Sequence, residues 1–128
     1  MAKDFIYRGK NVEELKAMDT REFAKMLKSR ARRTILRQYD VIEKFVARSK
    51  KEQDKGKQIR THERHIVVVP KMIDMTIYVH NGKEYVQTKI IGEMIGHRLG
   101  EFSLTRRKVQ HGAPGIGATK SSGAMSVK

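Results

Sequence analysis

The chain has 128 residues, with 28 basic and 14 acidic side chains, a formal net charge of +14 and no cysteine. This composition excludes disulfide scaffolds, cysteine nucleophiles and thiolate metal sites, and no apolar run approaches the roughly 20 residues that a membrane span needs. The N-terminus carries no apolar signal segment, so we expect a cytoplasmic protein. The charge predicts either nucleic acid or an anionic membrane surface as partner.

The charge is unevenly distributed and divides the chain into three predicted parts. Residues 1–58 carry 17 basic and 9 acidic side chains, residues 59–102 carry 6 and 5, and residues 103–128 carry 5 and none. We therefore expect a basic helical N-terminal extension over 1–58, a nearly neutral α+β core over 59–104 and a flexible basic tail over 105–128.

Helix start signals recur in the first part. Three pairs have the spacing of a capping box, namely Asn11 with Glu14, Asp19 with Glu22, and Asp40 with Glu43. In the stretch 29–37 that precedes the last pair, Ile35 and Leu36 are expected to be buried together with Tyr39. Gly56 is the expected end of the last helix.

The arginines of the stretch 29–37 form the first candidate nucleic-acid surface. Arg30, Arg33 and Arg37 follow one another at spacings of three and four, which places them on one helix face. No acid lies between Glu22 and Asp40 to pair with them, which favours contact with a polyanion over a merely solvated helix surface.

A β-hairpin is the clearest element of the middle part. The run 65–69 is rich in β-branched residues and ends at Pro70, and the run 75–80 alternates between apolar and polar residues. Asn81-Gly82 then predicts a two-residue type I′ turn, with His80 opposite Lys83 and Tyr78 opposite Tyr85. One face of this hairpin is apolar and should cover a core: Met75, Ile77, Val79, Val86 and Thr88.

The other face of the hairpin combines aromatic, cationic and polar side chains. Tyr78 and Tyr85 fit either an RNA-stacking platform or a second, minor core face. His80 and Lys83 lie next to the turn, and turns project outward, which favours an RNA contact for both.

A helix over 91–102 is expected to cover the apolar hairpin face. Its large apolar residues recur at helical spacing: Ile91, Met94, Ile95, Leu99 and Phe102. Gly92, Gly96 and Gly100 interrupt this pattern every four residues, and a close backbone approach at Gly96, to a strand or to a phosphate, would explain them. The predicted fold class is α+β, a small sheet with a β-hairpin and helices packed on one face.

The tail combines cations, glycines and few large apolar residues, so we expect it to be free in solution and ordered by a polyanion. Gly112 and Gly117 have the spacing of a phosphate-binding loop, but Ala118-Thr119 follows where that motif needs a lysine. The five histidines have no metal-ligand spacing, and no Ser-His-Asp set is apparent. No enzyme activity, metal, cofactor or small-molecule substrate is therefore expected.

Two longer motifs resemble a known family. The run Asn81-Gly82-Lys83 and, after Ile90, the run 94–105 (MIGHRLGEFSLT) resemble the signature of the universal S-nineteen family of small-subunit ribosomal proteins. The flanking runs 62–64, 69–72 and 75–80 are similar to that family too. The tail from 106 to 119 and the long helical N-terminus resemble its archaeal and eukaryotic branch. Ile91-Gly92 departs from bacterial members, which tend to carry a polar helix cap there.

The resemblance implies a protein in the head of the small ribosomal subunit, bound to the 3′ major domain of the small-subunit rRNA. It also implies the S-thirteen ribosomal protein as a neighbour, and a tail that reaches toward the decoding region and the tRNA in the A site or P site. A stand-alone RNA- or DNA-binding regulator is the alternative that shares the charge. Basic residues, turn and signature positions together give the expected RNA-binding set: Arg30, Arg32, Arg33, Arg37, Arg60, Arg64, His80, Asn81, Lys83, Lys89, His97, Arg98, Thr105, Arg106, Arg107, Lys108, His111 and Lys120.

Overall fold

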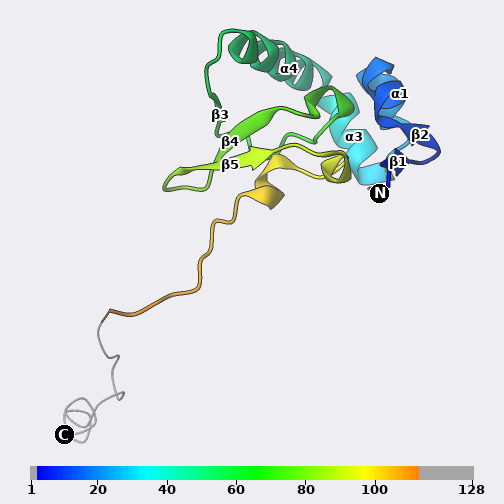
Figure 1. The fold of residues 1–128 in the computed structure, drawn as a ribbon. Helices are drawn as coiled ribbons and strands as arrows, with labels where there is room; N and C mark the ends of the chain where they lie inside the picture. Colours follow the sequence, from blue (N-terminus) through cyan, green and yellow to red (C-terminus); the bar gives the residue numbers. More distant parts are fainter. Residues whose placement is uncertain (1–2, 113–128) are drawn as a thin grey trace, which may run out of the picture.

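The computed structural model describes residues 3–112 and confirms a mixed α+β fold (Figure 1). The α-helices are α1 (Val12–Ala17), α2 (Thr20–Ala24), α3 (Ser29–Arg37) and α4 (Tyr39–Asp54). The strands are β1 (Ile6–Tyr7), β2 (Lys10–Asn11), β3 (Ile59–Thr61), β4 (Thr76–His80) and β5 (Tyr85–Lys89). Three short 3₁₀-helices complete the fold: η1 (Pro70–Met72), η2 (Gly92–Met94) and η3 (Leu99–Phe102).

The helix start signals have mixed outcomes. The Asn11 cap is confirmed, because the backbone N–H of Glu14 donates to its side-chain oxygen at 2.9 Å. Asp19 stands at the N-cap of α2 but makes no side-chain capping bond. The third start is wrong: α4 begins at Tyr39, so Asp40 lies inside its first turn. Gly56, with φ of +71°, follows the end of α4 as expected.

The predicted burial on α3 is confirmed for Ile35 and wrong for Leu36. Ile35 is fully buried, but Leu36 is 53% exposed, and Tyr39 is half-buried beneath the guanidinium of Arg21, 4.2 Å from its ring centre. Leu36 lies about 100° around the helix from Ile35. The face of α3 that packs on the core therefore includes Ile35 but not Leu36, although both residues are apolar.

The hairpin of β4 and β5 has the expected faces and a different register. Tyr85 lies opposite His80 and Gln87 opposite Tyr78, so the strands are shifted by two residues from the prediction. Side chains alternate between faces with a period of two, and the apolar face therefore survives this shift. Met75, Ile77, Val79 and Thr88 are buried.

The turn chemistry explains the shift. Asn81 uses its side-chain oxygen to accept the backbone N–H groups of Lys83 and Glu84, both at 2.9 Å, while its own N–H donates to the carbonyl of Glu84 at 3.0 Å. The turn therefore centres on Gly82 and Lys83, and Gly82 alone has a positive φ, +99°. A type I′ turn over Asn81-Gly82 would also need a positive φ at Asn81, so the expected turn is wrong.

Strand β3 is an element that the sequence analysis missed. It runs parallel to β4, pairing Ile59 with Ile77 and Thr61 with Val79, and makes β4 the central strand. It has only three residues, with the exposed Arg60 between two buried ones, and an alternation of three residues is too short to indicate a strand. β1 and β2 form a second small hairpin, whose turn residues Arg8 and Gly9 both have positive φ.

The expected helix over 91–102 is wrong. η2 and η3 are separated by an extended stretch in which Gly96 donates to the carbonyl of Val68 at 3.0 Å and Leu99 donates to that of Ile66 at 3.0 Å. The expected strand at 65–69 does not form. This segment contacts the extended stretch through backbone hydrogen bonds, including the two just described, and an isolated β-bridge between Val67 and Arg98. The glycines that weaken a helix here allow this pairing, and the close approach expected at Gly96 is confirmed.

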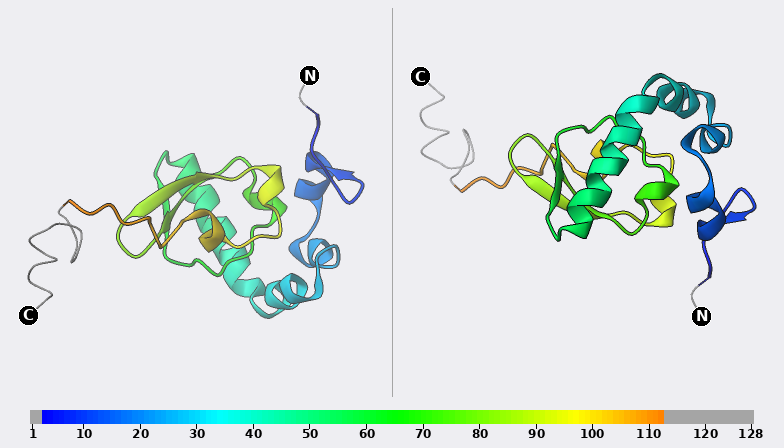
Figure 2. Two further views of the ribbon diagram at one scale, coloured as in Figure 1. Left: turned by 90° about the horizontal axis from the view of Figure 1, so that it is seen from below. Right: turned by 90° about the horizontal axis from the view of Figure 1, so that it is seen from above.

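The core is one cluster that draws on almost the whole described chain. Leu15, Phe23 and Ile35 from the N-terminal helices belong to it together with Val68 and Leu99. α4 lies across the three-stranded sheet and covers it with Ile42, Phe45 and Val46 (Figure 2). The cover that we assigned to residues 91–102 thus comes in large part from α4. None of the helices in residues 3–112 has the length and apolar character to cross a membrane.

Candidate nucleic-acid interface

The end of the β4–β5 hairpin carries a cluster of flat side chains. The imidazole rings of His62 and His80 lie 4.1 Å apart at 31°, and the ring of Tyr85 stands edge-on to both. The hydroxyl of Tyr85 is 3.0 Å from Nε2 of His62, and the Arg60 guanidinium lies 5.4 Å from the Tyr85 ring centre. Aromatic rings beside a guanidinium are the groups on which unpaired bases stack.

His62 was not among the expected site residues, although the motif at 62–64 pointed to it. Tyr78, by contrast, is paired with Gln87 and does not join the cluster, so the expected pairing of Tyr78 with Tyr85 is wrong. Tyr85 is 37% exposed whereas Tyr78 is half-buried, so Tyr85 is the more accessible of the two tyrosines to RNA.

The turn of the hairpin presents Lys83 to solvent. Gly82 donates its N–H to Nδ1 of His80 at 3.0 Å, and the side chain of Asn81 is engaged with the turn backbone. His80 and Asn81 therefore shape the turn, whereas the exposed Lys83 makes no side-chain bond within the described residues. Lys83 is the cation that this turn offers to a phosphate.

Arg64 holds three separate segments together. Its guanidinium donates to the carbonyls of His80 at 2.7 Å, Gly100 at 2.7 Å and Ser103 at 2.5 Å. Gly100 permits this contact, because a Cβ there would lie 2.9 Å from the Cβ of Arg64. The structure thus gives Arg64 an intramolecular role that the sequence analysis did not anticipate.

Two further expected RNA contacts have a comparable internal role. Arg32 donates to the carbonyls of Ala24, Lys25 and Leu27, and so closes the end of α2 against α3. Arg98 donates to the carbonyl of His65 and the hydroxyl of Thr34, which ties α3 to the bridge at Val67. Such carbonyl bonds depend on the tertiary fold, and no sequence spacing indicates them.

The remaining arginines of α3 are free within the described residues. Arg30, Arg33 and Arg37 are exposed and take part in no ion pair or side-chain hydrogen bond there, and the first turn of α3 contains no acid. The exposed Leu36 lies beside them. This arginine face, defined by Arg30, Arg33 and Arg37, therefore keeps its full charge for an external anion.

The other expected residues are exposed, with various neighbours. Arg60 donates to Gln58, His97 lies 2.7 Å from the carboxylate of Glu101, and Arg107 pairs with Glu84. Residues 105–112 form no helix or strand, and their candidates, together with Lys89 on β5, face solvent: Lys89, Thr105, Arg106, Lys108 and His111. Lys120 and the rest of the tail lie outside the described residues. Within residues 3–112 no group of His, Asp and Glu has the arrangement to hold a metal ion.

Comparison with protein families identifies the chain. The model of the family described as ribosomal protein S19 matches residues 30–111, which is well over half of the sequence. The match includes α3, the three-stranded sheet, the hairpin turn and the 3₁₀ region that follows it. The chain therefore belongs to the ribosomal protein S19 family, whose members are structural proteins of the small ribosomal subunit that bind its rRNA and are not enzymes.

Proposed function

We propose that this protein holds the 3′ major domain of the small-subunit rRNA in the head of the subunit, as a cytoplasmic member of the archaeal and eukaryotic branch of its family. The proposal rests on the arginine face of α3, which is charged, exposed and unpaired within the described residues. Phosphates neutralise such a face by replacing the counterions that it would otherwise bind.

The hairpin end supplies the second contact in this proposal. Lys83 reaches a phosphate, while Tyr85 with its neighbouring imidazoles offers a surface to an unpaired base. The branch assignment is supported by the sequence of the tail and by α1 and α2, which precede the region that the family model matches.

The partners beyond rRNA belong to the same proposal. The S-thirteen ribosomal protein is the expected protein neighbour, and the basic tail after Leu104 is expected to approach tRNA in the A site or P site. The tail contains five cations and no acid, which fits a nucleic-acid path better than a protein interface.

Sedimentation of a cell lysate tests the central claim. We expect an epitope-tagged chain to sediment with small subunits, and a variant with Arg30, Arg33 and Arg37 replaced by Gln to shift toward free protein. The matched control replaces Lys50, Lys51 and Lys55 of the far end of α4 and its cap, which removes the same charge. A tagged wild-type chain that stays at the top of the gradient would support the stand-alone regulator instead.

A further inference from the structure

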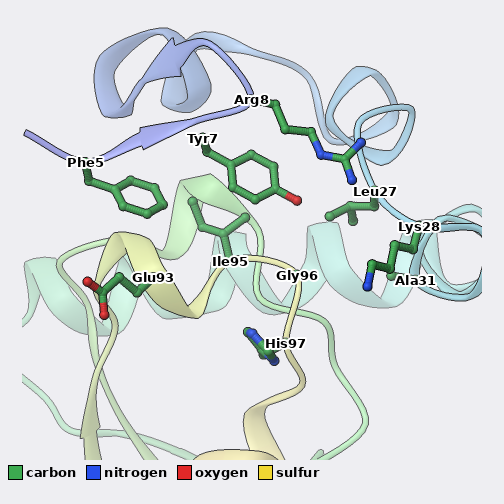
Figure 3. A pocket seen from close by; sticks show the side chains of 10 residues that line it. All are labelled: Phe5, Tyr7, Arg8, Leu27, Lys28, Ala31, Glu93, Ile95, Gly96 and His97. Carbon is green, nitrogen blue, oxygen red and sulfur yellow. The ribbon is translucent and has the colours of Figure 1, made fainter.

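A pocket of about 420 Å³ lies between the N-terminal hairpin and the 3₁₀ region (Figure 3). Phe5, Tyr7 and Arg8 come from the start of the N-terminal hairpin, Leu27 and Lys28 directly precede α3, and Ile95 and Gly96 follow η2. This volume falls within the range of natural small-ligand sites, about 300–1,000 Å³.

The walls of the pocket depend on two glycines. A Cβ at Gly92 would lie 2.6 Å from the ring of Phe5, so the absence of a side chain gives Phe5 its place. Gly96 has φ of +85°, and a Cβ there would lie 3.0 Å from Leu27. These residues are part of the glycine pattern that contradicted a helix, and they shape this pocket.

Three donor groups lie around one end of the pocket. Figure 3 shows the hydroxyl of Tyr7 and the guanidinium of Arg8 on the side of the N-terminal hairpin and the ammonium of Lys28 across from them, with the side chain of Leu27 between Arg8 and Lys28. Within residues 3–112 none of these three groups takes part in an ion pair or a side-chain hydrogen bond. A guanidinium, an ammonium and a hydroxyl form a donor set that matches a phosphate oxygen cluster.

The opposite end of the pocket has a different character. Phe5 and Glu93 lie there, well away from Lys28 (Figure 3). The Phe5 and Tyr7 rings are 6.5 Å apart at 22°, and both are half-buried, so they expose flat apolar surface beside Ile95. The Glu93 carboxylate repels a phosphate from this end, so a bound phosphate is favoured at the opposite, cationic end.

We propose that this pocket binds one unstacked nucleotide of the small-subunit rRNA, with its phosphate among Arg8, Lys28 and Tyr7 and its sugar or base against Phe5 and Ile95. The proposal rests on the proposed function, and extends it to a site formed partly by residues before the region that the family model matches. An acidic side chain of a protein would satisfy the cationic end alone, whereas a nucleotide also covers the aromatic wall.

Photocrosslinking in assembled subunits tests the occupant. Benzoylphenylalanine is introduced at position 7, and as a control at position 6, because neighbouring strand residues point to opposite faces and Ile6 is 64% exposed on the other side. We expect Tyr7→benzoylphenylalanine to crosslink to one rRNA nucleotide, mapped by a reverse-transcription stop, and Ile6→benzoylphenylalanine to leave that nucleotide untouched.

Other outcomes overturn the proposal in distinguishable ways. A crosslink from position 7 to a protein assigns the pocket to a protein segment and overturns the proposal. An absent crosslink, together with unchanged salt slopes for Arg8→Asn and Lys28→Gln, also overturns it, and both outcomes leave the proposed function intact. A chain that does not sediment with small subunits overturns both.

A binding measurement provides a second readout. Arg8→Asn keeps a residue that tolerates positive φ, and Lys28→Gln removes the other charge; each should lower the slope of log affinity against log salt by about 0.7–0.9. Lys10→Gln, on the same hairpin but outside the pocket, should leave the slope unchanged. Equal slopes for all three variants would contradict a phosphate at this site.

Discussion

Arg64 joins its own segment to the end of β4 and to the region of η3. Its three acceptors lie 16, 36 and 39 residues further along the sequence, and each is a backbone carbonyl. Only a planar guanidinium presents several donors in a fixed fork, so lysine is not an equivalent residue here.

We therefore predict that Arg64→Lys lowers the free energy of unfolding by about 1–3 kcal/mol, because partly buried carbonyls lose their donors. Urea denaturation followed by far-UV circular dichroism measures this loss. Arg60→Lys, on the exposed face of β3, is the matched control and should change the unfolding midpoint little. Unchanged stability with weakened RNA binding would instead identify Arg64 as an RNA contact.

Asp74 provides a pH-dependent contribution at the surface. Its hydrogen bond and ion pair with Lys16, at 2.8 Å, lower the pKa of its carboxyl below the usual value. A pKa that is lower in the folded state stabilises the fold above the unfolded value of about 3.9 and ceases to do so as the pH falls through the folded value.

The effect should be small, because the Asp74 side chain is 70% exposed and that of Lys16 40%, and exposed ion pairs contribute about 0–1 kcal/mol. Asp74→Asn suits this test, since Asp74 has φ of +71° and asparagine tolerates that conformation. By urea denaturation, we expect Asp74→Asn to be less stable than the unchanged chain at pH 7 and equally stable in strong acid. A Lys16→Gln variant should show the same deficit, and a deficit that persists in acid would contradict the ion-pair origin.

Among the elements, the hairpin turn separates a structural residue from a binding residue. Gly82 has φ of +99°, which costs a β-branched residue roughly 1–3 kcal/mol. We predict that Gly82→Val lowers the melting temperature, while Gly112→Val, at an exposed position with open space around it, does not. Lys83→Ala should keep the melting temperature and weaken binding to the rRNA domain. A destabilised Lys83→Ala variant with normal binding would reverse this assignment.

The elements also show which features the sequence can predict. The two faces of the hairpin follow from alternation, and they were correct although the turn was misplaced, because a shift of two residues preserves the faces. The turn itself was not predictable from Asn81-Gly82, since the Asn81 side chain replaces a backbone acceptor. The helical spacing of apolar residues over 91–102 was misleading, because these residues enter the core through extended and 3₁₀ segments.

The candidate site, too, was predictable in part from the sequence. The free arginine face on α3 could be predicted from spacing and the lack of nearby acids. The internal roles of Arg32, Arg64 and Arg98 could not, because their carbonyl acceptors are brought close only by the tertiary fold.

At the scale of the whole molecule, Ser103 marks where the folded part ends. Its hydroxyl is buried and donates to the carbonyl of Val79 at 3.1 Å, whereas Leu104 is 72% exposed. We predict that a chain ending at Leu104 keeps the far-UV spectrum and melting temperature of the full chain, and that one ending at Glu101 is destabilised. The shorter chain loses the acceptor that Arg64 uses at Ser103. Equal melting temperatures for the two truncated chains would contradict this boundary.

The charge of the whole chain predicts a steep salt dependence. If six to ten phosphates are contacted, affinity for the cognate rRNA domain should fall by about 10³–10⁵ between 50 and 200 mM salt, with the duplex-DNA magnitude as guide. Filter binding measures this slope, and it should be shallower for the chain ending at Leu104, which lacks the tail cations. A flat slope would contradict phosphate neutralisation as the basis of binding.

The continuity of the core has a consequence for how the protein is made. Leu15 and Phe23 leave the ribosome early, but Val68 and Leu99, which share their cluster, are synthesised much later. At about 5–20 residues per second, the 84 residues between Leu15 and Leu99 take roughly 4–17 s. For that time the nascent chain displays apolar side chains on strongly basic helices within reach of the RNA of the translating ribosome. The N-terminal helices therefore cannot bury their apolar faces completely until Leu99 has been synthesised.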